Sequence, residues 1–111
     1  MKFDVKEKDG AMVLTIKEKK INASISAELK AEFLILCKPK VTKKLLVVMK
    51  EVEFCDSSGL SALLIAHRAM KEHDGAVHLV QVHKKIADLL KLSQLDRLFN
   101  INKSVAEALK N

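Results

Sequence analysis

Tryptophan and tyrosine are absent from this 111-residue chain, and it has only one proline, three glycines and two cysteines. So little Pro and Gly excludes the low-complexity and disordered classes, and a composition of 49% hydrophobic and 31% charged residues is that of a folded chain. The length also limits the number of domains, because a typical domain has roughly 100–150 residues. We therefore expect residues 1–111 to form a single domain around one packed core.

Cysteine and histidine patterns for metal binding are missing too. Cys37 and Cys55 stand far apart without CxxC spacing, so neither a disulfide framework nor a zinc site is indicated. The four histidines lack HExxH and HxH spacing, which favours surface or packing roles; they are His67, His73, His78 and His83. We predict no metal and no cofactor, and the cysteine usage favours a reducing cytoplasm.

Long apolar runs are also lacking. The longest uncharged apolar stretch, residues 59–66, is far shorter than the ~18 residues that a membrane-spanning helix needs. The opening residues MKFDVKEKDG alternate charged with apolar side chains and contain no apolar run typical of a signal peptide. We therefore expect a soluble, cytoplasmic protein without membrane insertion.

Arginine is scarce although the chain is basic, with a net charge of +6 and a pI near 9.4. Such a charge suggests an acidic partner, which could be a nucleic acid, an anionic membrane or an acidic protein surface. Only Arg68 and Arg97 are arginines, however, and base readout and stacking favour Arg and aromatic rings. The lysines therefore predict a solvated face rather than direct binding of nucleic acid.

The first third of the chain predicts a β-hairpin followed by a helix. Residues 2–8 and 11–17 have strand character, and Asp9-Gly10 between them is a favoured two-residue turn. A short extended piece at Ile21 precedes a helix that Asn22 or Ser24 can cap. Its apolar positions recur at helical spacing and end before the single proline; they are Leu29, Phe33 and Leu36, with Pro39 after them.

From residue 45 onward, strand and helix patterns alternate. The all-apolar run 45–49 predicts a central strand that is buried on both faces. After a turn at 56–59 come a helix ending at Gly75, a strand at 76–82, a short helix at 86–90, a short strand at 98–101 and a closing helix at 105–109. Such alternation predicts an α/β fold with right-handed crossovers: an N-terminal hairpin, then a mixed, mainly parallel sheet covered by helices.

The tetrapeptide Asp56-Ser57-Ser58-Gly59 follows a predicted strand and opens a predicted helix. Unpaired N–H groups and the positive end of the helix dipole favour negative charge at that place, so it suits a phosphate, bound or covalent. The alternative is that Ser57 or Ser58 only caps the helix. The tetrapeptide alone leaves both possibilities open.

The segment VEFCDSSGL at residues 52–60 resembles the signature of the STAS domain of bacterial anti-sigma factor antagonists, and the similarity spans nearly the whole chain. Residues 21–29 resemble the family's entry into its first helix, and residues 76–82, 86–92 and 98–99 resemble its later strand, helix and strand. The resemblance implies a STAS fold. It also implies regulation of transcription by a protein-binding module that has no catalysis of its own.

In that family the first Ser after the Asp, here Ser57, is phosphorylated by a GHKL-type partner that is both serine kinase and anti-sigma factor. A PP2C-type phosphatase removes the phosphate, and the unphosphorylated protein sequesters the partner. The resemblance places the remaining candidate residues around that serine, as phosphosite-adjacent or partner-binding positions; they are Asn22, Asp56, Ser58, Gly59 and Leu60. The family usually has Asp where this chain has Asn22, and often Asp where it has Val48.

Two other functions compete with this one. The chain could be a constitutive STAS subunit of a lipid-transport or stress-signalling complex in which Ser57 is only a cap. It could also be a nucleotide- or anion-binding STAS domain that uses the same helix N-terminus. Hydrolysis by Ser57 is not supported, because GxSxG is absent and no triad partner is placed by local spacing. The sequence does not determine the oligomeric state.

Four local expectations complete the prediction. Asn22 should lie beside the Ser57 loop, and Gly59 should allow another backbone to approach that loop. Cys55 continues an apolar strand pattern and should be a small buried hydrophobe. All four phenylalanines should belong to the core; they are Phe3, Phe33, Phe54 and Phe99.

Overall fold

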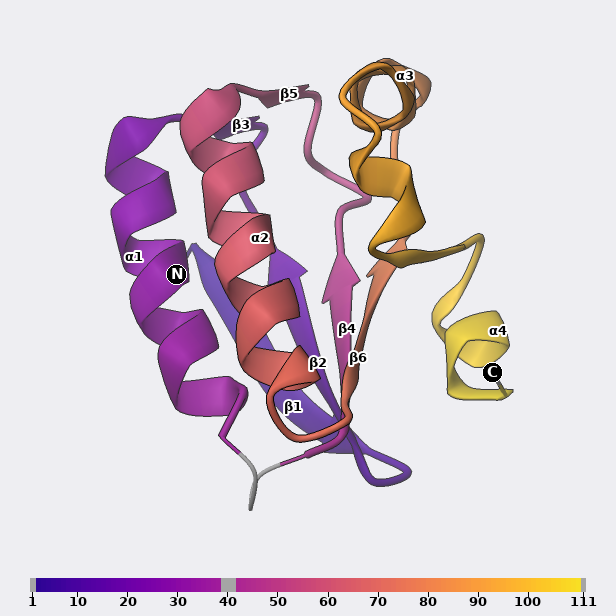
Figure 1. Cartoon of the computed structure of the whole chain (residues 1–111). Helices are drawn as coiled ribbons and strands as arrows, with labels where there is room; N and C mark the ends of the chain where they lie inside the picture. Colours follow the sequence, from indigo (N-terminus) through magenta and orange to yellow (C-terminus); the bar gives the residue numbers. More distant parts are fainter. Residues whose placement is uncertain (1, 39–41, 111) are drawn as a thin grey trace.

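In the computed structural model, which describes residues 2–38 and 42–110, the chain begins with the predicted hairpin (Figure 1). Strand β1 (Phe3–Lys8) pairs antiparallel with β2 (Ala11–Ile16). Asp9 and Gly10 have φ values of 51° and 81°, the left-handed conformation that a two-residue hairpin turn requires. Most of β1 is exposed, and its charged side chains protect this edge of the sheet from further pairing.

The main sheet has five strands in the order β1-β2-β4-β6-β7. Strand β4 (Lys44–Val48) lies at its centre with parallel neighbours on both sides, β2 and β6 (Ala76–Val80), as the apolar run predicted. The last strand, β7 (Asn100–Asn102), begins two residues later than the predicted strand. The delay arises because Leu95–Arg97 form a 3-10 turn, η1, and Leu98 closes that turn by donating its N–H to the carbonyl of Leu95.

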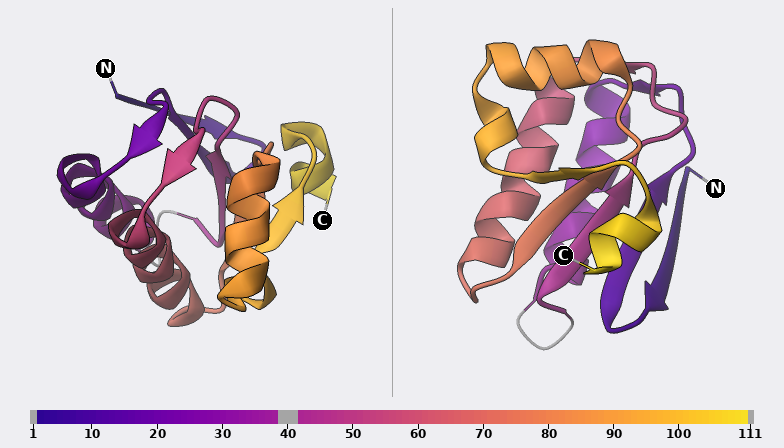
Figure 2. Two further views of the ribbon diagram at one scale, coloured as in Figure 1. Left: turned by 90° about the horizontal axis from the view of Figure 1, so that it is seen from above. Right: turned by 90° about the vertical axis from the view of Figure 1, so that its right-hand side faces the viewer.

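Helices α1 (Ala23–Leu36) and α2 (Ser57–Lys71) cover one face of the sheet, and α4 (Val105–Lys110) lies against the other (Figures 1 and 2). Alternate residues of the central strand therefore enter two apolar clusters. Leu45 and Val47 face α1 and α2, whereas Leu46 and Val48 face α4. The predicted end of α1 at Pro39 lies outside the described residues.

The end of α2 predicted at Gly75 involves two residues. Asp74 adopts the left-handed conformation, with φ 62°, and the N–H of Gly75 donates to the carbonyl of Met70 at 2.7 Å. A Cβ on Gly75 would lie 3.1 Å from the carbonyl oxygen of Lys43, the residue before β4. Glycine is therefore needed for close packing rather than for the left-handed turn itself.

A second, two-stranded parallel sheet consists of β3 (Lys20–Ile21) and β5 (Phe54–Cys55), and we call it the ribbon. Figure 2 shows it from above, with α1 and α2 on one side and α3 (Lys84–Leu92) on the other. Because Ile21 pairs with Cys55, the residues that follow them, Asn22 and Asp56, begin α1 and α2 side by side. The ribbon thus brings the two helix N-termini to one edge of the molecule.

None of the helices in the described part of the chain has the length and apolar character needed to cross a membrane.

Candidate functional site

Asp56 is the N-cap of α2. Its Oδ1 accepts hydrogen bonds from the backbone N–H groups of Ser58 and Gly59 at 3.0 and 3.1 Å, and from the Ser58 hydroxyl at 2.5 Å. These hydrogen bonds, above all the one from the Ser58 hydroxyl, lower the pKa of the Asp56 carboxyl below its usual value. The helix therefore begins with an ionised carboxylate, and neither serine is its cap.

This arrangement changes the electrostatics expected from the sequence. The sequence predicts unpaired N–H groups at the start of this helix that suit a phosphate, but those of Ser58 and Gly59 already donate to Asp56. A phosphate on the neighbouring Ser57 would meet a carboxylate rather than free donors. We therefore expect it to lie outward, in solvent.

Ser57 is the first residue of α2 and is exposed. Its hydroxyl has no hydrogen-bond partner among residues 2–38 and 42–110, whereas the Ser58 hydroxyl beside it is engaged. Of the two serines, Ser57 is therefore the one that an enzyme can reach and modify without first breaking a contact within the protein.

Asn22 is the N-cap of α1 and lies next to the Ser57 loop, as expected. Its Oδ1 accepts from the Ile25 N–H at 3.3 Å and from the Ser24 hydroxyl at 3.1 Å. The adjacency follows from the ribbon, in which the Asp56 N–H also donates to the Ile21 carbonyl at 3.3 Å. Two exposed cap segments, one carrying Asn22 and the other Ser57, therefore share one edge.

A contact that sequence reasoning missed joins the two helices. Ser26 of α1 is only 1% exposed, and its hydroxyl lies 3.0 Å from the Ser58 hydroxyl, which is half-buried. The available signal was a polar residue on the same helix face as Ile25, Leu29 and Phe33. Ser58 is thus a bridge between α1 and the Asp56 cap.

Gly59 allows close packing in the interior of the protein. It is buried, and a Cβ there would lie 2.4 Å from Cys55 Sγ and 2.9 Å from Ile21 Cγ2. The expectation that another backbone approaches at Gly59 is wrong, because its close neighbours are side chains of the ribbon within the same chain. Leu60 is half-buried and packs against the main core.

Cys55 is buried, as expected, and burial raises the pKa of its thiol to about 11, with a smaller contribution from the charge of Asp56. Its Sγ donates to the Asp56 carbonyl at 3.6 Å. A protonated, buried thiol is a poor nucleophile at neutral pH. Val48, where the family often has Asp, is 7% exposed and packs in the cluster under α4 rather than at the Ser57 loop.

Phe54 is the largest departure from the expected core. Phe33 and Phe99 are buried and Phe3 is half-buried, but Phe54 is 52% exposed on the ribbon. Strand residues alternate between faces, and Ile21 and Cys55 point into the core. Phe54 and its pairing partner Lys20 therefore point outward, on the surface next to the loop that carries Ser57.

The histidines have unrelated surroundings. The His67 ring meets Phe99 edge-on, His73 and His83 each lie within hydrogen-bonding distance of a backbone carbonyl, and His78 is bonded to Asn102. Within residues 2–38 and 42–110, no group of three His, Cys, Asp or Glu side chains is arranged to hold a metal ion.

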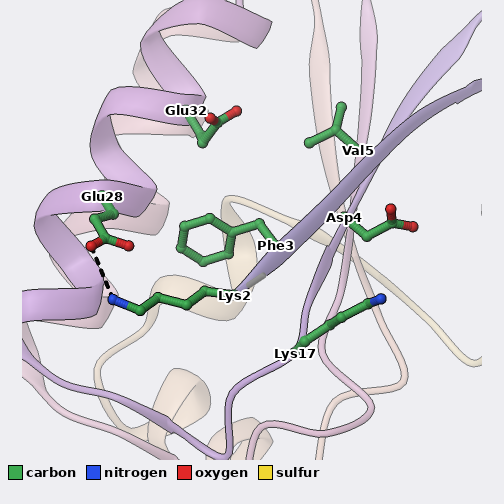
Figure 3. Close-up of a pocket in the computed structure, with 7 residues that line it drawn as sticks. All are labelled: Lys2, Phe3, Asp4, Val5, Lys17, Glu28 and Glu32. Carbon is green, nitrogen blue, oxygen red and sulfur yellow. Dashed lines mark hydrogen bonds and ion pairs between the residues drawn. The ribbon is translucent and has the colours of Figure 1, made fainter.

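A hollow of about 790 Å³ lies between β1 and α1, away from Ser57 (Figure 3). Figure 3 shows Phe3 pointing toward the helix and Lys2 reaching Glu28, an ion pair with an N–O distance of 3.0 Å. Both groups of that pair are largely solvated, so the pair adds little stability. The hollow has no feature that connects it with the Ser57 loop.

Comparison with known proteins matches residues 2–108 to the STAS domain family. A Thermotoga maritima protein described as an anti-sigma factor antagonist has 25% identity and a TM-score of 0.84, over 97% of this chain and 92% of that one. An anti-sigma-factor antagonist domain protein from Planctomyces limnophilus has 19% identity and a TM-score of 0.88, over 97% and 94%. The Bacillus protein SpoIIAA in its phosphorylated form has 15% identity and a TM-score of 0.77, over 97% and 96%.

The same fold also occurs in larger assemblies. A component of the stressosome, a signalling hub, has 18% identity and a TM-score of 0.72, over 96% of this chain and 93% of that one. The murine anion transporter Slc26a9 has 16% identity and a TM-score of 0.76, over 95% of this chain but only 18% of the transporter.

Proposed function

This chain belongs to the STAS domain family, and we propose that it is an anti-sigma factor antagonist that works as a phosphorylation-switched binding module. In this proposal, unphosphorylated Ser57 marks the state that sequesters a GHKL-type serine kinase acting as anti-sigma factor, and a PP2C-type phosphatase restores that state. The chain itself regulates transcription by binding in the cytoplasm and performs no catalysis.

The observation that carries the proposal is that Ser58 has a structural role at the start of α2 whereas Ser57 has none. Asp56 caps α2 and Ser58 bridges Asp56 to Ser26, so neither task requires Ser57. An exposed hydroxyl with no structural task can be modified without unfolding the helix start. The likeness to solved anti-sigma factor antagonists, one of them in a phosphorylated form, supports the same function.

Phosphorylation would act by local charge. A phosphoserine brings about −1.5 to −2 charges at neutral pH. At Ser57 that charge stands beside the Asp56 carboxylate, whose lowered pKa keeps it ionised, and the N–H groups of Ser58 and Gly59 already donate to that carboxylate. The phosphate therefore gains little from its own protein and stays at the surface, where it opposes docking by repulsion and by the cost of desolvation.

The first test identifies the modified residue. The protein is incubated with its GHKL-type kinase and Mg-ATP, and the product is mapped by peptide mass spectrometry. We expect phosphate on Ser57 of the wild type and none on Ser57→Ala. The matched control is Ser93→Ala, which removes an exposed hydroxyl at the C-cap of α3, outside the edge that carries Ser57, and should leave phosphorylation normal. Phosphate on Ser58 with Ser57 empty would overturn the assignment.

The second test measures affinity for the same kinase by isothermal titration. Ser57→Ala should bind like the unphosphorylated wild type, and Ser57→Asp should bind about tenfold or more weakly, because one charge is an imperfect substitute for a phosphate. Asn100→Asp adds the same charge on exposed β7 and should bind normally. Equal affinities for Ser57→Ala and Ser57→Asp would instead support the constitutive subunit, the role suggested by the stressosome neighbour.

A further inference from the structure

The outward face of the ribbon combines an exposed aromatic ring with a lysine, Lys20, that has no ion-pair partner among the described residues. Lys20 and Phe54 stand opposite each other in the parallel pairing, and their strand neighbours Ile21 and Cys55 fill the core side. Glu53 and Phe54 are held in place by their N–H groups, which donate to the Lys19 carbonyl at 2.7 and 3.0 Å. Phe54 is thus an apolar side chain on a fixed backbone, and a rigid aromatic residue of this kind is a typical anchor of a protein interface.

A lysine-lined hollow lies on the β3 side of Phe54. It measures about 640 Å³ and is lined by Lys17, Lys19 and Lys20 together with Asn22 of the α1 cap and two carboxylates, Glu18 and Glu51. Lys2 also reaches this hollow, but it is ion-paired with Glu28. None of the three other lysines has an ion-pair partner among the described residues.

A second hollow lies on the other side, between the ribbon and the start of α3. It measures about 450 Å³ and is lined by Lys84 and Lys85 with His83 and Glu53. Lys84 is bonded to Asp88 at 2.9 Å, and both groups remain exposed. Because Lys84 is paired with Asp88, Lys85 and Glu53 balance in charge here, and the excess of positive charge beside the exposed ring lies in the first hollow. Figure 2 shows the order β3, β5, α3 from above.

We propose that Lys20, Phe54 and the two flanking hollows form the docking face for the kinase-type partner, and that the partner presents an apolar pocket for Phe54 within an acidic rim. This inference rests on the proposed function, because Phe54 is exposed three residues before Ser57, at the edge that a kinase acting on Ser57 approaches. The excess of lysines in the first hollow and the net charge of +6 make the complementary surface negative. Burial of the ring supplies affinity, and the lysines set the orientation and the association rate.

The test uses the kinase that phosphorylates Ser57 and measures its affinity for unphosphorylated variants at one fixed salt concentration. Phe54→Ser should weaken binding about tenfold, the loss typical of an aromatic anchor. Lys20→Glu should weaken it about two- to fivefold, the range of an exposed ion pair. The matched controls lie elsewhere: Leu34→Ser removes a side chain that is 58% exposed on α1, and Lys6→Glu reverses an exposed charge on β1.

We expect both control variants to bind like the wild type. Far-UV circular dichroism confirms that each variant is folded, and Phe54→Leu, which keeps an apolar side chain at this position, should retain most of the affinity. If Phe54→Ser and Lys20→Glu bind like the wild type while Ser57→Asp still binds weakly, the docking face is refuted and the switch stands. If Phe54→Ser binds weakly while Ser57→Asp binds normally, the docking face stands and the switch is refuted.

Discussion

At the residue scale, the two adjacent serines differ in what they contact. The Ser58 hydroxyl bridges the Asp56 carboxylate and the Ser26 hydroxyl, whereas Ser57 makes no hydrogen bond within the described residues. Ser26→Ala and Ser58→Ala should each lower the free energy of unfolding by about 1 kcal/mol. Because the two hydroxyls share one contact, the double variant should lose less than the sum of the single losses.

Urea unfolding followed by far-UV circular dichroism measures these differences, since the chain has no Trp or Tyr for fluorescence. Ser57→Ala is the internal control and should change the free energy of unfolding by no more than about 0.5 kcal/mol, the usual range for a surface position. If Ser57→Ala lowered the free energy of unfolding by about 1 kcal/mol and Ser58→Ala did not, Ser57 rather than Asp56 and Ser58 would hold the start of α2.

Residue types and spacing predicted part of this site. Asn22 could be placed as a cap, and residues 56–59 as the turn between a strand and a helix, because such turns have recognisable patterns; the cap expected there was Ser57 or Ser58, whereas it is Asp56. Ser26 and Phe54 could not be placed, for a common reason. Each stands at a position whose exposure is set by tertiary packing: a serine on a buried helix face, and a phenylalanine on the outward side of a two-residue strand.

At the element scale, α4 is held to the sheet by polar contacts as well as by apolar packing. His78 of β6 is 2% exposed, and its Nδ1 lies 2.8 Å from Asn102 Oδ1; the Asn102 amide in turn donates to Glu107 Oε1 at 3.1 Å. The ammonium group of Lys44 donates to the carbonyl oxygens of Ala108 and Leu109 at 3.1 and 3.3 Å. The start and the end of this short helix are therefore both tied to the sheet.

Acid should weaken this attachment. Burial, together with the charge of Lys44, lowers the pKa of His78, while the hydrogen bond to Asn102 opposes that shift. The unfolded chain then binds more protons than the folded one below the ordinary His pKa of about 6.5. The contribution of neutral His78 to stability is complete above that pH and is lost as the pH falls from there through the lowered pKa of the folded state.

Amide hydrogen exchange between pH 7 and pH 5, corrected for the intrinsic effect of pH, tests this expectation. Protection of α4 in the wild type should fall toward the lower pH, and His78→Gln, which cannot titrate, should remove that dependence. His83→Gln is the control, because His83 is exposed and far from α4 in the sequence. Protection that falls equally in wild type and His78→Gln would assign the acid effect to other groups.

The elements themselves were largely predictable from periodicity. The hairpin, the central strand and all four helices lie where the patterns placed them, because their apolar positions face a core. The ribbon was only partly predicted, because strands of two residues show no periodicity in the sequence. Strand β7 begins later than predicted because η1 includes the residues before it. The positions of short elements are thus set by their neighbours rather than by their own sequence.

At the scale of the whole molecule, charge has a long-range and a short-range role that can be separated. The net charge of +6 attracts an acidic partner over distances that salt screens. Phosphorylation removes only about 1.5 to 2 of those charges, so the molecule stays basic and attraction persists. The proposed switch therefore depends on where the new charge stands, beside Asp56 at the docking face, rather than on the sum.

This distinction gives the last prediction. Raising NaCl from about 50 to about 500 mM should slow association with the kinase about tenfold, because long-range attraction is screened. The unphosphorylated and the Ser57-phosphorylated protein differ in affinity, and the ratio of their affinities should change little by comparison. A phosphate buried against the partner clashes with it and must lose its water, and salt removes neither penalty. Stopped-flow association and isothermal titration at both salt concentrations measure the two quantities. A ratio that falls to one at high salt would mean that phosphorylation acts only through long-range charge, and the local mechanism would have to be abandoned.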